Sequence, residues 1–149
     1  MLKTYQKYII KNFISKFFLI TLIFFALTII LGSLEEVSFV KKLDVNFLYP
    51  YYLTLLNAPI TLFEIFPFIL LLTTQFLFYE MYKKDELNML KVSGLTNLSL
   101  IKIVFLLSIL IGIFNVIFFY NIASNLKFHY SNLKNNLSND NKYLAMVTK

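Results

Sequence analysis

The sequence predicts an all-α integral membrane protein with three membrane-spanning helices, and three observations lead to this fold class. Of the 149 residues, 58% are apolar and only 15% are charged, whereas an ordinary soluble domain is about 45–50% apolar and about 25% charged. Apolar stretches of roughly 20 residues, the length that crosses a bilayer as a helix, occur three times. The lysines flank these stretches, so the net charge of +6 indicates a membrane surface and no nucleic-acid partner.

Each span is placed by a run that is uncharged or nearly so. We expect the first span over about residues 13–34, the second over about 52–79 and the third over about 98–120. The second is expected as one long helix, because no polar loop within it could reverse the chain in water. The first apolar run is too long for a signal peptide and lacks a small-residue cleavage site, which predicts an uncleaved helix.

The distribution of lysines predicts how these spans are oriented. Eight lysines lie within residues 3–16 or 83–102, at or before the start of the first span or around the 80–102 loop, and four lie at 41, 42, 127 and 134, in the other loop or soon after the third span. Because cytoplasmic loops carry the excess of basic residues, the N-terminus and the 80–102 loop are predicted to be cytoplasmic. The 35–46 loop and the C-terminal tail are then predicted to face outward.

A polar segment between the second and third spans predicts a short helix at the membrane surface, over about residues 80–94. Its acids lie near its start, where the helix dipole favours them, and leucines recur near helical spacing. Gly94 is placed to be its left-handed C-cap, and Thr96 or Asn97 is placed to cap the next span. The periodicity leaves two interpretations open: a solvated loop that anchors two spans, or a docking helix for a cytoplasmic partner.

Residues 127–149 are predicted to leave the membrane as an amphipathic helix. A turn is expected at residues 138–141 and a strand at 143–148. An isolated strand is not stable, so we expect this strand to begin a further domain. The helical spacing rests on five residues: Ile122, Leu126, Tyr130, Leu133 and Leu137.

The residues give no sign of catalytic chemistry. There is no cysteine and too little glycine for a phosphate-binding loop, so any use of ATP is expected to come from another chain. His129 has no partners at metal-ligand spacing. We therefore expect no catalytic residues, no metal and no cofactor. Glu64, the one acid within an apolar stretch, is interpreted as a water-exposed carboxylate, and Ser108 with Gly112 as a small-residue packing face.

Residues 85–95, with the sequence DELNMLKVSGL, resemble the signature (S/D)-E-L-x-x-(M/L)-x-(A/V)-S-G-(hydrophobic) of the LptF/LptG permeases, the membrane subunits of a lipopolysaccharide exporter. Pro59 and Pro67, eight residues apart, and the pair Lys41 and Lys42 agree with the resemblance and favour an LptG-like member. The resemblance covers essentially the whole chain.

The resemblance also carries expectations about organisation. Members of the family have six spans with a β-jellyroll between the third and fourth. It implies that residues 1–126 form the N-terminal half of a membrane domain and that 127–149 lead into a periplasmic jellyroll that the chain lacks. The implied function is a permease subunit, without an ATPase site of its own, of an ATP-driven system that extracts lipopolysaccharide from the bacterial inner membrane. The implied partners are an LptB-like cytoplasmic ATPase, an LptF-like sister permease, an LptC/LptA-like periplasmic bridge, lipopolysaccharide and membrane lipids.

The same resemblance implies roles for individual residues. Glu86 matches the coupling-helix glutamate that meets the ATPase, where a carboxylate can pair with an arginine. The rest of the implied partner surface consists of Leu87, Leu90, Ser93 and Gly94.

Lys41 and Lys42 are the implied contacts for lipid A phosphates, since an ammonium is a good point-charge partner for phosphate. The chain departs from the family just before them. Family members often carry a basic residue near the outer end of the first span, and this chain has Glu35 and Glu36 there.

Two other classes of function remain open from the sequence. One is a small structural multi-span subunit of a membrane complex, for example a respiratory one. The other is an ion channel or proton carrier built around Glu64, because charged residues inside membranes are often functional.

Overall fold

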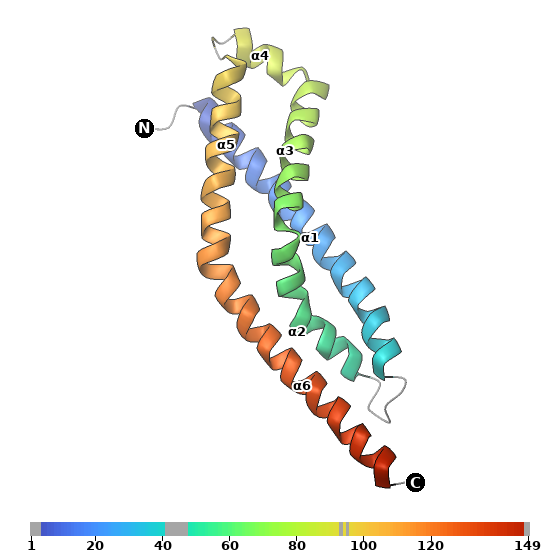
Figure 1. Ribbon diagram of the computed structural model, residues 1–149. Coiled ribbons are helices and arrows are strands. Elements are labelled where there is room, and N and C mark those ends of the chain that lie inside the picture. The colour runs from blue at the N-terminus through green and yellow to red at the C-terminus, as the bar shows by residue number, and fades with distance from the viewer. Residues whose placement is uncertain (1–3, 41–47, 93, 95, 148–149) are drawn as a thin grey trace. The chain divides into compact units, whose positions relative to one another are not determined.

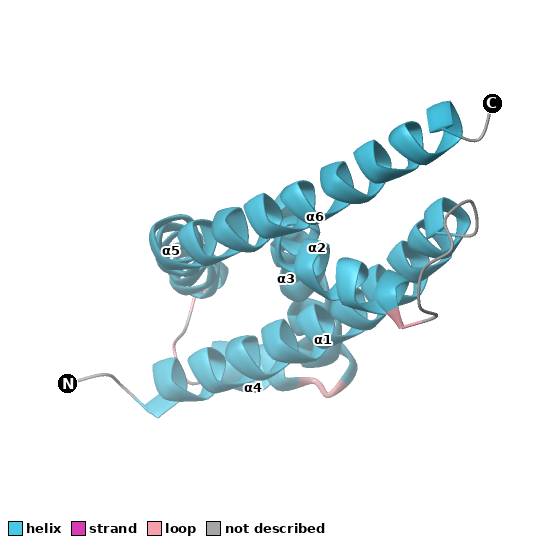
Figure 2. Ribbon diagram, turned by 90° about the horizontal axis from the view of Figure 1, so that it is seen from below, coloured by secondary structure: helices cyan, strands magenta, loops and turns pink. Residues whose placement is uncertain are grey.

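The chain folds into helices over the residues that its computed structural model describes, which are 4–40, 48–92, 94 and 96–147. Figure 1 follows the helices along the chain, and Figure 2 shows helix and loop, with no strand, in this part. The predicted all-α class is confirmed. The elements are α1 (Thr4–Val40), α2 (Tyr49–Glu64), α3 (Phe66–Lys83), α4 (Glu86–Val92), α5 (Asn97–Phe114), a π-helical turn (Asn115–Phe119) and α6 (Tyr120–Val147).

Two helical stretches are long and apolar enough to cross a membrane without interruption. They are Tyr5–Val40 in α1 and Asn97–Leu137, which runs from α5 through the π-helical turn into α6. The helices α2 and α3 pass the same test only as one interrupted span. Length and composition therefore agree with a membrane protein of two to three spans.

The single helix expected over 52–79 is interrupted at Ile65. Pro67 is the second residue of α3. Proline has no N–H for the carbonyl four residues earlier, and its ring would collide with that carbonyl in a continuous helix. The Ile65 carbonyl accepts hydrogen bonds from the N–H groups of Phe68 (3.0 Å) and Ile69 (3.1 Å), which starts α3 afresh. Pro59, by contrast, lies inside α2.

The chain forms two compact units, Met1–Phe24 with Ile65–Val116, and Phe25–Glu64 with Ile117–Lys149. In the first unit, α1, α3 and α5 meet in an apolar cluster that we call the three-helix cluster. Each helix contributes two buried residues four positions apart, which places them on one helix face. The cluster consists of Ile9, Phe13, Leu77, Met81, Leu100 and Val104.

In the second unit, α2 packs along α6, and α1 approaches α2 closely at Gly32. A Cβ atom on Gly32 would lie 2.9 Å from Cγ2 of Thr54. The Thr54 hydroxyl donates to the Pro50 carbonyl (2.9 Å) within α2. The small residue that allows this approach is therefore Gly32, whereas at Gly112 no described atom comes within 4 Å of an added Cβ.

The tail differs from the turn and strand expected at 138–141 and 143–148. The helix α6 continues through both segments as far as Val147, and Thr148 lies outside the described residues. The prediction was wrong there because it followed local residue preferences. A helix satisfies its own backbone hydrogen bonds, whereas a strand needs a neighbour. The chain is helical from Tyr120 to Val147, so the segment expected to follow the third span is a helix.

Candidate partner-binding site

The helix α4 joins α3 to α5 at one end of the first unit (Figure 1). It is shorter than the expected helix over 80–94, because α3 continues to Lys83 and the chain turns before Glu86. The turn passes through Asp85, whose φ of 58° is left-handed, a conformation that aspartate tolerates better than most residues. The Asn88 side-chain amide donates to the Asp85 carboxylate (2.6 Å) and holds the turn against the first turn of α4.

The end of α4 matches the predicted capping. Gly94 has a φ of 84°, and its N–H donates to the Lys91 carbonyl (2.9 Å), as a left-handed C-cap does. Thr96 caps α5, because its hydroxyl accepts from the Ser99 N–H (3.3 Å). Both predictions are confirmed, and they explain why α4 stops and α5 starts where they do.

The two faces of α4 have different surroundings. Leu87 and Leu90 are half-buried and pack against the three-helix cluster, so they hold α4 to the rest of the unit. On the other face, Met89 is 67% exposed and Val92 is 90% exposed. Of these two apolar side chains, Val92 is the more exposed to solvent.

An open hollow of about 320 Å³ adjoins α4. It brings one residue of α3, two of α4 and three of α5 to a single opening with a mostly apolar wall. The lining residues are Phe78, Leu87, Lys91, Asn97, Leu100 and Ile101.

Glu86, the first residue of α4, is tied to α1 by a hydrogen bond. The Tyr8 hydroxyl donates to Oε1 of Glu86 (2.8 Å), across 78 positions of the sequence. This contact uses one of the two carboxylate oxygens, and a carboxylate can accept at both. Glu86 therefore stands at the surface in an orientation set by α1, a contact that the sequence analysis missed.

A second link joins α1 to α3 beside α4. Glu80 makes ion pairs with Lys16 of α1 and with Lys84 (2.6 Å). The hydrogen bond and the charge of Glu80 raise the pKa of Lys84 above its ordinary value, so Lys84 stays charged at neutral pH. The Tyr8–Glu86 hydrogen bond and the Lys16–Glu80 ion pair therefore hold the N-terminal part of α1 against the end of α3 and the start of α4.

Three of the predicted site residues lie outside the described part of the chain. They are Lys41 and Lys42, the expected phosphate contacts, and Ser93 of the expected partner surface.

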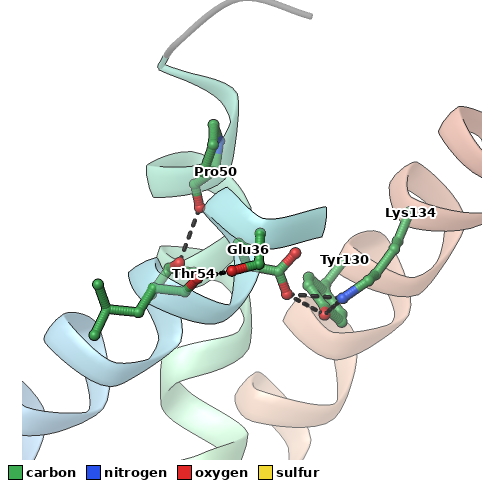
Figure 3. Close-up of polar contacts among 7 residues, drawn as sticks. Glu36, Pro50, Thr54, Tyr130 and Lys134 are labelled. Carbon is green, nitrogen blue, oxygen red and sulfur yellow. Dashed lines mark hydrogen bonds and ion pairs between the residues drawn. The ribbon is translucent and has the colours of Figure 1, made fainter. Parts of the chain in front are cut away.

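A buried polar cluster in the second unit had no signal in the sequence (Figure 3). Glu36 is 3% exposed, and two side chains of α6 point at its Oε1. The Tyr130 hydroxyl donates to this oxygen (2.5 Å), and the Lys134 ammonium donates to the same oxygen (2.9 Å) and to the Tyr130 hydroxyl (2.6 Å). Lys134 also lies 4.7 Å from the ring centre of Phe39. We call these residues the Glu36 cluster.

Glu36 was expected in the loop over 35–46, and this is corrected by the structure, in which α1 continues to Val40 and Glu36 is buried. Tyr130 and Lys134 lie 94 and 98 positions away, so no local pattern reveals them. Glu64 behaves differently: its side chain is 61% exposed and makes an ion pair with Lys127 at 3.4 Å, as expected for a water-exposed carboxylate. Among the described residues, no three acidic or histidine side chains are grouped closely enough to hold a metal.

Comparison with known protein families identifies the kind of protein to which α4 and the Glu36 cluster belong. The family described as lipopolysaccharide export system permease LptF/LptG matches residues 7–149. The chain belongs to the LptF/LptG family. No curated protein and no solved structure matches it. The match covers the three-helix cluster, α4 and the Glu36 cluster alike.

Membership in the LptF/LptG family makes the chain a permease component of lipopolysaccharide export. This excludes the small structural subunit of a respiratory complex and the channel built around Glu64 as its class. The family is one of transporter subunits of the bacterial inner membrane, which work with other components of the export system.

Proposed function

We propose that this LptF/LptG family chain is a subunit of an ATP-driven exporter that extracts lipopolysaccharide from the outer leaflet of the inner membrane and passes it to a periplasmic bridge protein. In this proposal ATP is hydrolysed by a separate cytoplasmic ATPase, and α4 receives its motion. The observation that carries the proposal is the attachment of α4. Leu87 and Leu90 fix it to a cluster shared by α1, α3 and α5, so a push on α4 reaches three helices.

The proposed docking surface is the exposed side of α4. Glu86 offers a carboxylate for an arginine of the ATPase, and Met89 and Val92 offer exposed apolar contacts next to it. Leu87 and Leu90, on the buried side of α4, fix the position of the helix by packing against the three-helix cluster. Ser93, the residue after Val92 in the sequence, completes the proposed surface, and Gly94 caps the end of α4.

The orientation and domain limits belong to the same proposal. The excess of lysines supports a cytoplasmic N-terminus and a cytoplasmic α4, with 127–149 on the periplasmic side, leading from a membrane domain over 1–126 into a β-jellyroll. Lys41 and Lys42, on the periplasmic side, are proposed to contact lipid A phosphates. We propose that the chain is LptG-like, with an LptF-like sister permease.

The docking role is tested by replacing Glu86. The variant Glu86→Ala removes the carboxylate that we expect to pair with the ATPase, at a position where the side chain makes an exposed hydrogen bond with Tyr8. We expect co-purification with the ATPase to fall by at least about tenfold, since losing one partner of a charged hydrogen bond weakens a complex by 2 kcal/mol or more. Circular dichroism of the purified chain is expected to be unchanged.

The matched control is Glu35→Ala, which removes an exposed carboxylate from the other predicted side of the membrane. Its co-purification with the ATPase should equal that of the original chain. Equal co-purification of Glu86→Ala would contradict the docking role, and an equal loss in both variants would show that charge alone is responsible.

A further inference from the structure

The solvent-exposed face of α3, near its C-terminal end, carries two adjoining hollows. One has a volume of about 370 Å³ and is lined by Gln75, Phe76 and Tyr79. The other has a volume of about 410 Å³ and is lined by Phe76, Tyr79, Glu80, Lys83 and Lys84. Because both share Phe76 and Tyr79, they form one groove, apolar at one end and charged at the other. We call it the α3 groove.

The charged end of the α3 groove has an excess of positive charge. Its lining contains two lysines and one carboxylate, and Lys16 of α1 also contacts that carboxylate, Glu80. Lys84 is held by Glu80 at 2.6 Å, which leaves Lys83 as the lysine of the lining whose charge Glu80 does not offset. An anionic group that enters the groove would meet a net positive site.

The apolar end of the α3 groove is not covered by the chain itself. Phe76 is 53% exposed and Tyr79 is 63% exposed, and neither belongs to the three-helix cluster. Aromatic side chains beside lysines are typical of the level at which lipid headgroups meet acyl chains. Basic pockets on the cytoplasmic side of membrane helices bind anionic headgroups.

We propose that the α3 groove binds one anionic glycerophospholipid, with its phosphate at Lys83 and Lys84 and an acyl chain along Gln75, Phe76 and Tyr79. The occupant is a resident lipid of the cytoplasmic leaflet and not the exported cargo. This last point rests on the proposed orientation, in which cargo is taken from the opposite leaflet. The lipid would brace the end of α3 next to the turn that leads into α4.

The absence of tryptophan from the sequence allows a direct test. The variant Tyr79→Trp places the chain's single tryptophan in the groove, where it can be excited selectively, and the full chain is reconstituted in phosphatidylcholine vesicles that contain a minor fraction of brominated lipid. Bromine quenches tryptophan on contact. We expect brominated phosphatidylglycerol to quench roughly five times more effectively than brominated phosphatidylcholine, because a lysine near a membrane surface is worth about 1 kcal/mol towards an anionic lipid.

Adding Lys83→Gln to the reporter should abolish this preference, while the matched change Lys102→Gln, an exposed lysine on α5, should leave it intact. A reporter on α5 far from any lysine, Ile113→Trp, 53% exposed in the original chain, should be quenched equally by both lipids. Circular dichroism confirms that each variant is folded. A second variant, Phe76→Ala, should weaken quenching by both brominated lipids.

Equal quenching of the Tyr79→Trp reporter by the two lipids would overturn the proposal, as would loss of the preference with Lys102→Gln. A competition measurement with added lipopolysaccharide completes the test. If lipopolysaccharide displaces brominated phosphatidylglycerol, the groove belongs to the cargo path and the proposal of a resident lipid is wrong. None of these measurements includes the ATPase, so they separate this inference from the docking role of α4.

Discussion

At the scale of single residues, Glu36 shows how strongly one buried charge depends on its partners. It is almost inaccessible to water, and its Oε1 receives both donors of the Glu36 cluster, Tyr130 and Lys134. Its Oε2 has no hydrogen-bond partner among the described residues. A buried carboxylate that loses its cation is far less stable than an apolar side chain in the same place.

Lys134→Met is therefore expected to lower the free energy of unfolding by about 3 kcal/mol. The double variant Glu36→Leu with Lys134→Met should recover most of that loss, since it removes the stranded charge. Chemical unfolding followed by circular dichroism measures both. The control is Lys127→Met, which breaks the exposed pair with Glu64 and should change stability by less than about 1 kcal/mol. If the double variant is as unstable as Lys134→Met, the instability of Lys134→Met does not come from the unpaired charge of Glu36.

Tyr8 acts at the same scale by setting the direction of Glu86. Tyr8→Phe keeps the ring and removes one exposed hydrogen bond, so the free energy of unfolding should change by less than about 1 kcal/mol. The ATP hydrolysis of the reconstituted exporter should nevertheless fall several-fold, because Glu86 loses the contact that orients it towards the ATPase. Tyr82→Phe, at an exposed tyrosine near α4, serves as the control. Unchanged hydrolysis in Tyr8→Phe would mean that Glu86 needs no help from α1.

At the scale of elements, the two helical glycines are expected to respond in opposite ways to the same substitution. Gly32→Ala forces a methyl group to within 2.9 Å of Thr54, and overpacking of this kind lowers stability by about 1–3 kcal/mol. Gly112→Ala meets no described atom, and alanine favours a helix over glycine by about 1 kcal/mol. Unfolding of the two variants measures the difference, and equal effects would contradict the close approach of α1 to α2.

The elements also show which local signals in a sequence are decisive. The caps at Gly94 and Thr96 were predicted because each depends on one residue and its immediate neighbours. The interruption at Ile65 was missed, although Pro67 was visible, because the length needed to cross a membrane argued for one continuous helix. The prediction of a strand at 143–148 was wrong because the strand preference of single residues is a weak signal by itself and no neighbouring strand is present among the described residues to pair with them.

The candidate site was predictable only where it follows a motif. The residues of α4 could be named from the sequence, but not which of them face inwards. Leu87 and Leu90 pack on the three-helix cluster while Met89 and Val92 face out, and this depends on how α3 ends. The partners of Glu86 and Glu36 come from positions 78 to 98 residues away, beyond the reach of any periodicity.

At the scale of the whole molecule, membership in the LptF/LptG family suggests why the attachment of α4 to the other helices matters for transport. A short helix fixed by two leucines to three longer helices, and tied to α1 through Tyr8 and Glu86, can move those helices together. Rigid movement of packed helices is a common way to open or close a cavity. The account requires that α4 face the cytosol, where an ATPase can reach it.

Cysteine labelling tests that requirement most directly, because the chain contains no cysteine of its own. Val92→Cys places a thiol on α4 at a position that is 90% exposed, and Phe128→Cys places one on α6 at a position that is 66% exposed. A maleimide that cannot cross the inner membrane should label Phe128→Cys in intact cells. It should label Val92→Cys only after that membrane is broken, and less when the ATPase is bound. Labelling of Val92→Cys in intact cells would contradict both the orientation and the docking role of α4.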